Sequence, residues 1–328
     1  MSASSAGPEP IGIGAIHCLL PDTLTPLAEL PEYGQLDHGQ KEFTTSTGIA
    51  TVGVEDGSGN AELAARAVRE LLSAHPGDPD VLLMVGPRAP DVLLGSDVCR
   101  VQHETKLDRA FSFTVDGLGC TGSSAAWALA RDLLVADPSR RSVLITHAST
   151  PTGPDRVRPP VTVIGDGAYA MTMVRGGRPV LRAHRMETDG AFHGLFSVDY
   201  RQTPWYEWRE ECASPDRYSF ELALHSRQRL GRMVDEVLAE AGVGKDRVAA
   251  TLMQNVTAGA FDFYQSLLGL PIHDVCREHL RAYGHQGAMD VVFNLDSLLR
   301  SGELSPGDLV LVLNNSPVAA WAVTLWEV

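Results

Sequence analysis

The sequence is poor in basic residues and in long apolar runs, and both absences exclude classes of protein. Its 27 lysines and arginines stand against 41 acidic residues, so the net charge is -14 and nucleic acid is not an expected partner. No apolar run reaches the about 18 residues of a membrane span, and residues 1–10 lack the order of a signal peptide. We therefore expect a cytoplasmic protein that has no membrane partner.

Closely spaced cysteines are also missing. The five cysteines are Cys18, Cys99, Cys120, Cys212 and Cys276, and no two of them form a Cys-x-x-Cys pair. An odd number of cysteines without such a pair argues against a disulfide framework and against a zinc site. We therefore expect reduced thiols, one of them reactive, and no bound metal.

Apolar runs alternate with segments of helical periodicity, which is typical of mostly parallel sheets covered by helices. Before a turn at 175–179, the pattern predicts strands at 11–16, 81–85, 111–115, 142–147 and 168–174, and helices at 60–74 and 122–136. After the turn it predicts strands at 180–186, 249–253, 309–313 and 319–326, and helices at 220–241, 259–268 and 287–301. The 328 residues therefore suggest an α/β protein of two similar halves, 1–174 and 175–328.

Cys120 is the candidate nucleophile. It stands in Val115-Asp-Gly-Leu-Gly-Cys120-Thr-Gly, between a predicted strand and a predicted helix of small residues. Glycines permit a sharp turn there, and the positive end of the helix dipole favours the thiolate form. The alternative from spacing alone is a small cysteine buried against close-packed glycines.

Four segments in order along the chain resemble the β-ketoacyl-acyl-carrier-protein synthase III family of the thiolase superfamily. They are Cys120 with its glycines, Gly165-Asp-Gly-Ala168, Tyr283-Gly-His-Gln-Gly-Ala288 and 309–328. The resemblance implies a thiolase-like five-layered αβαβα fold, a homodimer, and an acyl-accepting role for Cys120. It also implies that Asp166 holds a turn between the halves.

The resemblance further implies a histidine and an asparagine beside the cysteine, and in this chain the two residue types are exchanged. His285 stands where the family has asparagine, and family spacing places Asn255 where it has histidine. If the count is instead anchored on Gln254, Met253 takes that place and the histidine is simply lost. With the exchange, His285 is the expected base and Asn255 the expected amide donor.

The end of the chain departs from the family as well. The family has a glycine there, whose N–H helps to form the oxyanion hole, but alignment on Trp321 places Pro317 at that position. Proline has no N–H, so a neighbour such as Asn315 or Ser316 must compensate, or the acyl chemistry must be slow. A shift of one residue in the alignment would remove this difficulty.

No tightly bound cofactor is expected, and the expected substrate is an acyl thioester of CoA or of phosphopantetheine on a carrier protein. By resemblance Arg158 contacts the nucleotide end of CoA, with a plain surface cation as the alternative. Trp205 and Trp208 lie in a long polar stretch, 189–217, which we expect to cover the substrate or contact a partner. An acidic carrier would need a local basic patch, such as Arg140-Arg141.

Three functions remain open at this point. In the first, Cys120 passes an acyl group to a hydroxyl or amine of a small acceptor molecule in secondary metabolism, such as antibiotic biosynthesis. In the second, the chain forms carbon–carbon bonds by decarboxylative condensation. In the third, it is a non-catalytic partner subunit. His147, which ends a predicted strand, either reaches a substrate or has a structural role.

Overall fold

The computed structural model describes residues 9–55, 57–151, 156–199 and 201–328, with only the backbone of Trp205. Its main strands are β1 (Ile11–Leu19), β4 (Val81–Val85), β5 (Phe111–Val115), β6 (Ser142–Ser149), β9 (Gly167–Arg175), β10 (Val180–Thr188), β13 (Val248–Met253), β14 (Leu309–Ser316) and β15 (Ala320–Glu327). The helices are α1 (His38–Ser46), α2 (Asn60–Ala74), α3 (Asp97–Thr105), α4 (Gly122–Ala136), α5 (Ala223–Ala241), α6 (Ala258–Leu268), α7 (Asp274–Tyr283) and α8 (Asp290–Ser301).

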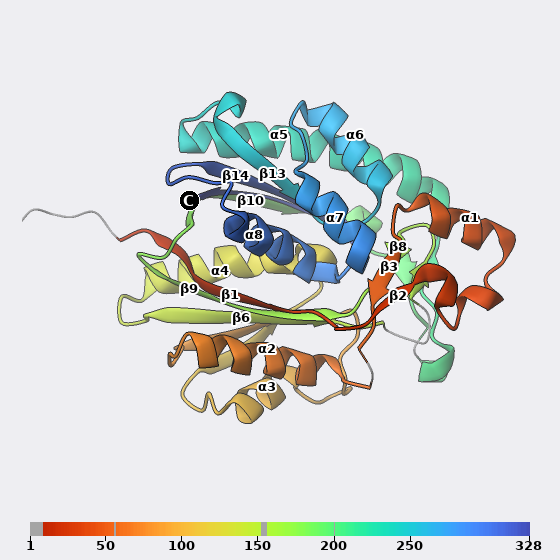
Figure 1. The fold of residues 1–328 in the computed structure, drawn as a ribbon, viewed down its shortest axis with the longest axis horizontal. Helices are drawn as coiled ribbons and strands as arrows, with labels where there is room; N and C mark the ends of the chain where they lie inside the picture. Colours follow the sequence, from red (N-terminus) through yellow and green to blue (C-terminus); the bar gives the residue numbers. More distant parts are fainter. Residues whose placement is uncertain (1–8, 56, 152–155, 200) are drawn as a thin grey trace, which may run out of the picture.

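The elements stack as alternating layers of helices and strands (Figure 1). Helices α5 and α6 cover the strands β10, β13 and β14, and α4 and α8 lie beneath these strands in the middle of the molecule. Strands β1, β6 and β9 form the next layer, and α2 and α3 cover its far face. This is the thiolase-like αβαβα arrangement that the resemblance implied.

The strand order shows the same pattern twice. The sheet runs β13-β14-β15-β10-β1-β9-β6-β4-β5. In the first half β4 is parallel to β6, and β9 is antiparallel to both β6 and β1. In the second half β13 is parallel to β14, and β15 is antiparallel to both β14 and β10. The expectation of two similar halves agrees with this order, while the boundary at residue 174 stays a prediction.

The two halves of the sheet meet at one residue pair, Gly12 with Val180. A Cβ atom on Gly12 would collide with the carbonyl of Gly177, so the two backbone segments approach too closely for any residue other than glycine. This single pair joins two twisted sheets that otherwise face each other across α4 and α8.

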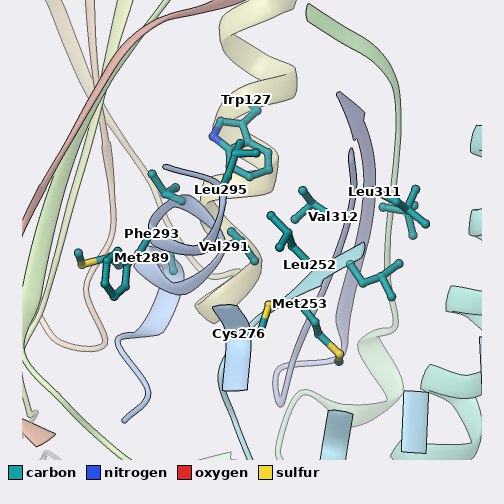
Figure 2. Packing of buried hydrophobic residues seen from close by; sticks show 14 of the residues in the cluster. Trp127, Leu252, Met253, Cys276, Met289, Val291, Phe293, Leu295, Leu311 and Val312 are labelled. Atoms are coloured by element: carbon teal, nitrogen blue, oxygen red, sulfur yellow. The ribbon is translucent and has the colours of Figure 1, made fainter. Parts of the chain in front are cut away.

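The core lies around the two middle helices (Figure 2). Trp127 of α4 is fully buried and packs edge-on against Trp326 of β15, with ring centroids 5.3 Å apart. Figure 2 shows Val291 of α8 close to Leu252 of β13. Each large apolar side chain buried in this way contributes about 1.5–3 kcal/mol. The packing fixes α4, and therefore the residue at its start, between both sheets.

The long stretch 189–217 contains short pieces of structure instead of one open loop. Strands β11 (Phe196–Ser197) and β12 (Glu211–Cys212) pair antiparallel, and a π turn over Arg217–Leu222 leads into α5. The other short strand pairs are β2 (Leu24–Pro26) with β3 (Thr51–Gly53) and β7 (Val157–Arg158) with β8 (Thr162–Val163). Among the described residues, no helix has both the length and the apolar character needed to cross a bilayer.

Candidate active site

A cavity of about 340 Å³ opens where β4, β5 and β6 end. In α/β proteins the crevice beyond the carboxyl ends of the strands is the usual place for a ligand. Its wall is built by residues of both halves, in the segments 86–88, 116–120, 147–150, 196–198, 285–288 and 316–318, together with single residues that include Arg158 and Glu210. The stretch 189–217 therefore borders the cavity.

Cys120 lies on this wall, in a short 3-10 turn that leads into α4. The turn depends on Gly119, whose φ of +53° lies in the left-handed region that favours glycine. Gly122 lets the helix approach β4, because a Cβ atom there would lie 2.5 Å from Val85. Asn314 fixes the turn by donating a 2.9 Å hydrogen bond to the Cys120 carbonyl. The thiol is therefore held at the start of a buried helix with 8% of the residue exposed.

His285 faces this thiol. Its Nε2 atom lies 3.1 Å from the Sγ atom of Cys120, and the residue is 2% exposed. Its backbone is fixed to the other half of the chain, because its N–H bonds the Val163 carbonyl and its own carbonyl accepts from Gly165, both at 3.0 Å. A Cβ atom on Gly165 would collide with the Tyr283 carbonyl, so this approach also requires glycine.

Asp290 completes a chain of three side chains. Its Oδ2 atom accepts a 2.6 Å hydrogen bond from His285 Nδ1, and its two oxygens also accept backbone N–H bonds from Asn255 and Gln286, at 2.7 and 2.8 Å. Burial alone would lower the pKa of His285, but the charges of Cys120 and Asp290 outweigh burial and raise it to about 10. A protonated His285 imidazole is therefore favoured beside the Cys120 sulfur.

The structure does not bring the Asn255 side chain to the cavity. Its amide pairs with that of Asn294 in α8, whose Nδ2 donates to Asn255 Oδ1 at 2.9 Å. Only the backbone N–H of Asn255 reaches the site, through Asp290. In the other alignment considered above, Met253 takes that place, and its side chain is fully buried and is not among the residues that line the cavity.

Asp290 was missed by the sequence reasoning. An acidic residue in the first turn of a helix is common, because it stabilises the helix dipole. The available signal was its place five residues after His285, across a glycine that permits a turn.

Pro317 lines the cavity beside Cys120 and offers no N–H there. The Ala319 N–H is taken by the Ser316 carbonyl at 2.9 Å. The hydroxyl of Ser316 also lines the cavity and lies so close to Gly119 that a Cβ atom on that glycine would collide with it. This hydroxyl accepts a 3.4 Å hydrogen bond from the Val318 N–H, which leaves its own hydrogen available to a ligand oxygen.

The predicted substrate-binding residues divide into two groups. Arg158 lines the cavity, and its Nε donates a 2.8 Å hydrogen bond to Glu210. The other oxygen of Glu210 forms an ion pair with Arg88, 2.7 Å from its guanidinium nitrogen. Burial and the Arg158 charge lower the pKa of Arg88 to about 10, against the opposing effect of Glu210. Trp208 is not among the lining residues, and its indole N–H bonds the Thr203 carbonyl at 2.9 Å. The side chain of Trp205 lies outside the described part of the chain.

Asp166, expected to hold a turn between the halves, is fully enclosed. It forms a two-pronged ion pair with Arg156, at 2.6 and 2.8 Å, and its carbonyl accepts from the Gln286 side chain at 2.7 Å. These contacts tie the first half to the loop that carries His285.

Comparison with known proteins shows a likeness to one family of synthases. The family model for the C-terminal part of 3-oxoacyl-[acyl-carrier-protein] synthase III matches residues 238–328. β-Ketoacyl-[acyl-carrier-protein] synthase III of Erythrobacter litoralis is 25% identical over 272 residues, which are 80% of this chain and 82% of that relative. The Synechocystis enzyme of the same name is 22% identical over 276 residues, 81% of this chain and 82% of its own.

Solved structures share the fold along almost the whole chain. The structure of ChlB3, called an acyltransferase, has a TM-score of 0.83 and 24% identity, covering 97% of this chain and 98% of its own. Synthase III of Pseudomonas aeruginosa has a TM-score of 0.79 and 18% identity, with the same two coverages. The chain is therefore similar to synthase III proteins along most of its length.

This synthase III-like protein is therefore an enzyme of the transferase type. The matched C-terminal segment includes His285, Asp290 and Pro317, so both departures from the family pattern lie inside the most family-like part of the chain. Within the described residues, no group of acidic, histidine and cysteine side chains is arranged to hold a metal ion.

Proposed function

We propose that this protein is an acyltransferase of secondary metabolism, such as antibiotic biosynthesis. In this proposal Cys120 takes an acyl group from a thioester and passes it to a hydroxyl or amine. The contact between His285 and the Cys120 sulfur, with Asp290 behind it, carries the proposal. A nucleophile, a base and a carboxylate that orients the base form a recurring arrangement for acyl transfer.

The first half of the reaction loads the cysteine. The Cys120 thiolate attacks the thioester carbonyl, and the resulting oxyanion accepts hydrogen bonds from the Cys120 N–H and from the Ser316 hydroxyl, in place of the N–H that Pro317 lacks. The intermediate collapses to acyl-Cys120, and the departing thiol takes the proton that His285 carries on Nε2.

The second half releases the acyl group to the acceptor. His285 is now neutral, and its Nε2 accepts the proton of a hydroxyl or amine as that group attacks acyl-Cys120. Asp290 stabilises the imidazolium that forms. Collapse of the second intermediate releases the ester or amide, and the proton on His285 restores the thiolate–imidazolium pair.

Decarboxylative condensation has less support in the described residues. That reaction needs two neutral donors aimed at one enolate oxygen. The amide of the second predicted donor, Asn255, is hydrogen-bonded to Asn294 and does not reach the cavity. The hydrogen bond from His285 to Asp290 orients His285 as a base. The relatives are named synthases. Condensation is therefore the alternative reaction that a test of the transfer proposal has to exclude.

The proposed donors are acyl thioesters of CoA or of a carrier protein, and the names of the relatives mention the acyl-carrier protein. Arg158 and Arg88, which share the carboxylate of Glu210, are the cations proposed to meet an anionic part of the donor, and Asp116 adds a second carboxylate to the cavity wall. Trp205 and Trp208 remain proposed contacts of the donor.

A homodimer is part of the proposal. Strand β5 is the last strand of the main sheet, and Phe111 on it is 67% exposed. An apolar ring on an open strand edge is a surface that a second copy would cover.

The loading test uses purified protein with a panel of acyl-CoA and acyl-carrier-protein thioesters. Intact mass should reveal an acyl adduct on the wild-type chain and none on Cys120→Ala, with circular dichroism unchanged. Cys276→Ala is the matched control, because Cys276 is also buried but lies against β13 (Figure 2). An adduct that persists in Cys120→Ala would contradict the assignment of the nucleophile.

A further inference from the structure

His147 is a buried titratable residue that the proposed reaction does not use. It lies in β6, one residue after the last residue that pairs with β4. It lines the same cavity as Cys120 and His285 and is 3% exposed. Its Nδ1 atom lies 3.0 Å from the Val85 carbonyl. Because a carbonyl only accepts, Nδ1 must carry the hydrogen in this bond.

The other ring nitrogen is therefore an acceptor. Burial lowers the pKa of His147 to about 4, so the ring is neutral and Nε2 carries a lone pair. Across the described residues, Nε2 has no hydrogen-bond partner. A buried acceptor without a donor destabilises a protein, so this atom calls for a donor from the cavity.

This acceptor is itself enclosed, and it lies beside a glycine in the cavity wall. Gly287, two residues after His285, has a φ of +62°, and a Cβ atom there would lie 3.3 Å from His147 Nε2. The charges of His285 and Asp290 both act on the His147 ring. A ligand that reaches His285 can therefore also meet His147.

The number of O–H and N–H hydrogens on the acceptor limits which ligands can bond both His285 and His147. In the proposed transfer His285 Nε2 takes the proton of the attacking group. A lone alcohol has only that one hydrogen, so nothing is left for His147. A 1,2-diol has a second hydroxyl hydrogen, and a primary amine has a second N–H.

We propose that the acyl acceptor carries a second hydrogen-bond donor beside its nucleophilic atom, as a 1,2-diol or a primary amine does, and that His147 Nε2 binds this donor. This inference rests on the proposed function and specifies its acceptor class. His147 is a positioning residue in this scheme, because it orients the acceptor and takes no proton.

Two substitutions separate the acceptor atom from the structural bond. His147→Asn can keep a donor to the Val85 carbonyl but has no atom at the place of Nε2. His147→Gln can place an amide oxygen there. His184→Asn is the matched control, because His184 is also buried, bonds through Nδ1 to Thr324 at 2.9 Å and has an unpartnered Nε2, yet lines none of the cavities found in the described residues.

The kinetic test starts from acetyl-Cys120, formed with p-nitrophenyl acetate so that no natural donor is needed. Deacylation is followed by intact mass with ethane-1,2-diol against 2-methoxyethanol, and with methylamine against dimethylamine. We expect wild type to prefer the first member of each pair by about tenfold, beyond the statistical advantage of the diol. The two pairs show which acceptor class is used.

The expected pattern across the variants is specific. His147→Asn should remove the preference, His147→Gln should restore most of it and His184→Asn should keep it, while loading stays within about twofold of wild type, since no variant touches the proton path. A preference that survives in His147→Asn, or that wild type never shows, overturns the inference. Slower loading in His147→Asn also overturns it, because His147 would then bind the donor.

A second readout keeps the inference testable if Cys120 cannot be loaded, a result that would contradict the proposed function. In protein with ¹⁵N-labelled histidine, the His147 Nε2 resonance is assigned by its loss in His147→Asn. Ethane-1,2-diol should shift it and 1,2-dimethoxyethane, which has no donor, should not. Equal responses to both probes overturn the inference.

Discussion

The cavity has two walls that differ in how firmly their side chains are held. The catalytic wall, Cys120, His285 and Asp290, is almost completely buried, and its polar atoms bond one another. In the outer wall, Arg88, Arg158 and Glu210, two side chains are more exposed, Arg88 at 26% and Glu210 at 18%, while Arg158 is 9% exposed. Rigid placement suits proton transfer, and a partly hydrated cluster suits recognition of a changing donor.

This difference predicts unequal effects of substitution, and the largest should come from the catalytic wall. His285→Gln removes the base while keeping a polar side chain of similar length. We expect acyl transfer to fall about 10²-fold or more, the usual range for general-base loss, as measured by product formation under saturating donor. Asn255→Ala is the comparison, because its amide bonds Asn294 and not the thiol, so it should lose less activity. Near-normal transfer by His285→Gln would contradict the mechanism.

The Ser316 hydroxyl should come next. Ser316→Ala removes the donor proposed to replace the missing N–H of Pro317, so loading and release should both slow by about 10²-fold. Single-turnover kinetics of each half-reaction measures this. Asn315→Ala, one residue away, is the control. A Ser316→Ala enzyme as fast as wild type would place the oxyanion elsewhere.

Asp290→Asn should change the pH profile as well as the rate. The Asp290 charge raises the pKa of His285, so its removal lowers that pKa. Since only neutral His285 accepts the acceptor's proton, the rise of the release rate with pH should move to lower pH by about one unit or more. Rates of acyl-Cys120 release between pH 5 and 10 would show this. A profile that stays in place would separate Asp290 from the proton path.

The smallest effect should come from the outer wall. Arg158→Ala should raise the KM for the thioester by about tenfold and leave kcat within twofold, because Arg158 contacts Glu210 and not the reacting atoms. Arg109→Ala, at an exposed ion pair with Asp78, is the control. A fall in kcat larger than the rise in KM would contradict the assignment of donor binding to the outer wall.

Burial and periodicity allowed most of the fold to be predicted from the sequence. The bounds of α2, α4, β4 and β5 agree with prediction, because α2 and α4 carry apolar residues at helical spacing, β4 is a short run of apolar residues, and β5 is rich in aromatic and β-branched residues. Helices α1, α3 and α7 were not predicted. They are short and polar, and side-chain caps stabilise their starts, such as the reciprocal bonds between Asp37 and Gln40.

The site was predictable only where a motif carried it. Cys120 and His285 stood in recognisable segments, and the structure places them in contact. Asn255 and Asp290 depended on contacts between distant segments, since Asn255 pairs with a residue of α8 and Asp290 meets its N–H. The predicted helix 287–301 begins instead with a 3-10 turn over Gly287–Met289, and this turn places Asp290 behind His285.

The most direct test of transfer against condensation offers both routes to one acyl-enzyme. Acyl-Cys120 protein is incubated with a malonyl thioester labelled at its free carboxyl group, together with an alcohol or amine acceptor. We predict that the acyl group leaves as an ester or amide and that no labelled carbon dioxide is released. Stoichiometric labelled carbon dioxide together with a 3-oxoacyl thioester would contradict the transfer account and establish the condensing one.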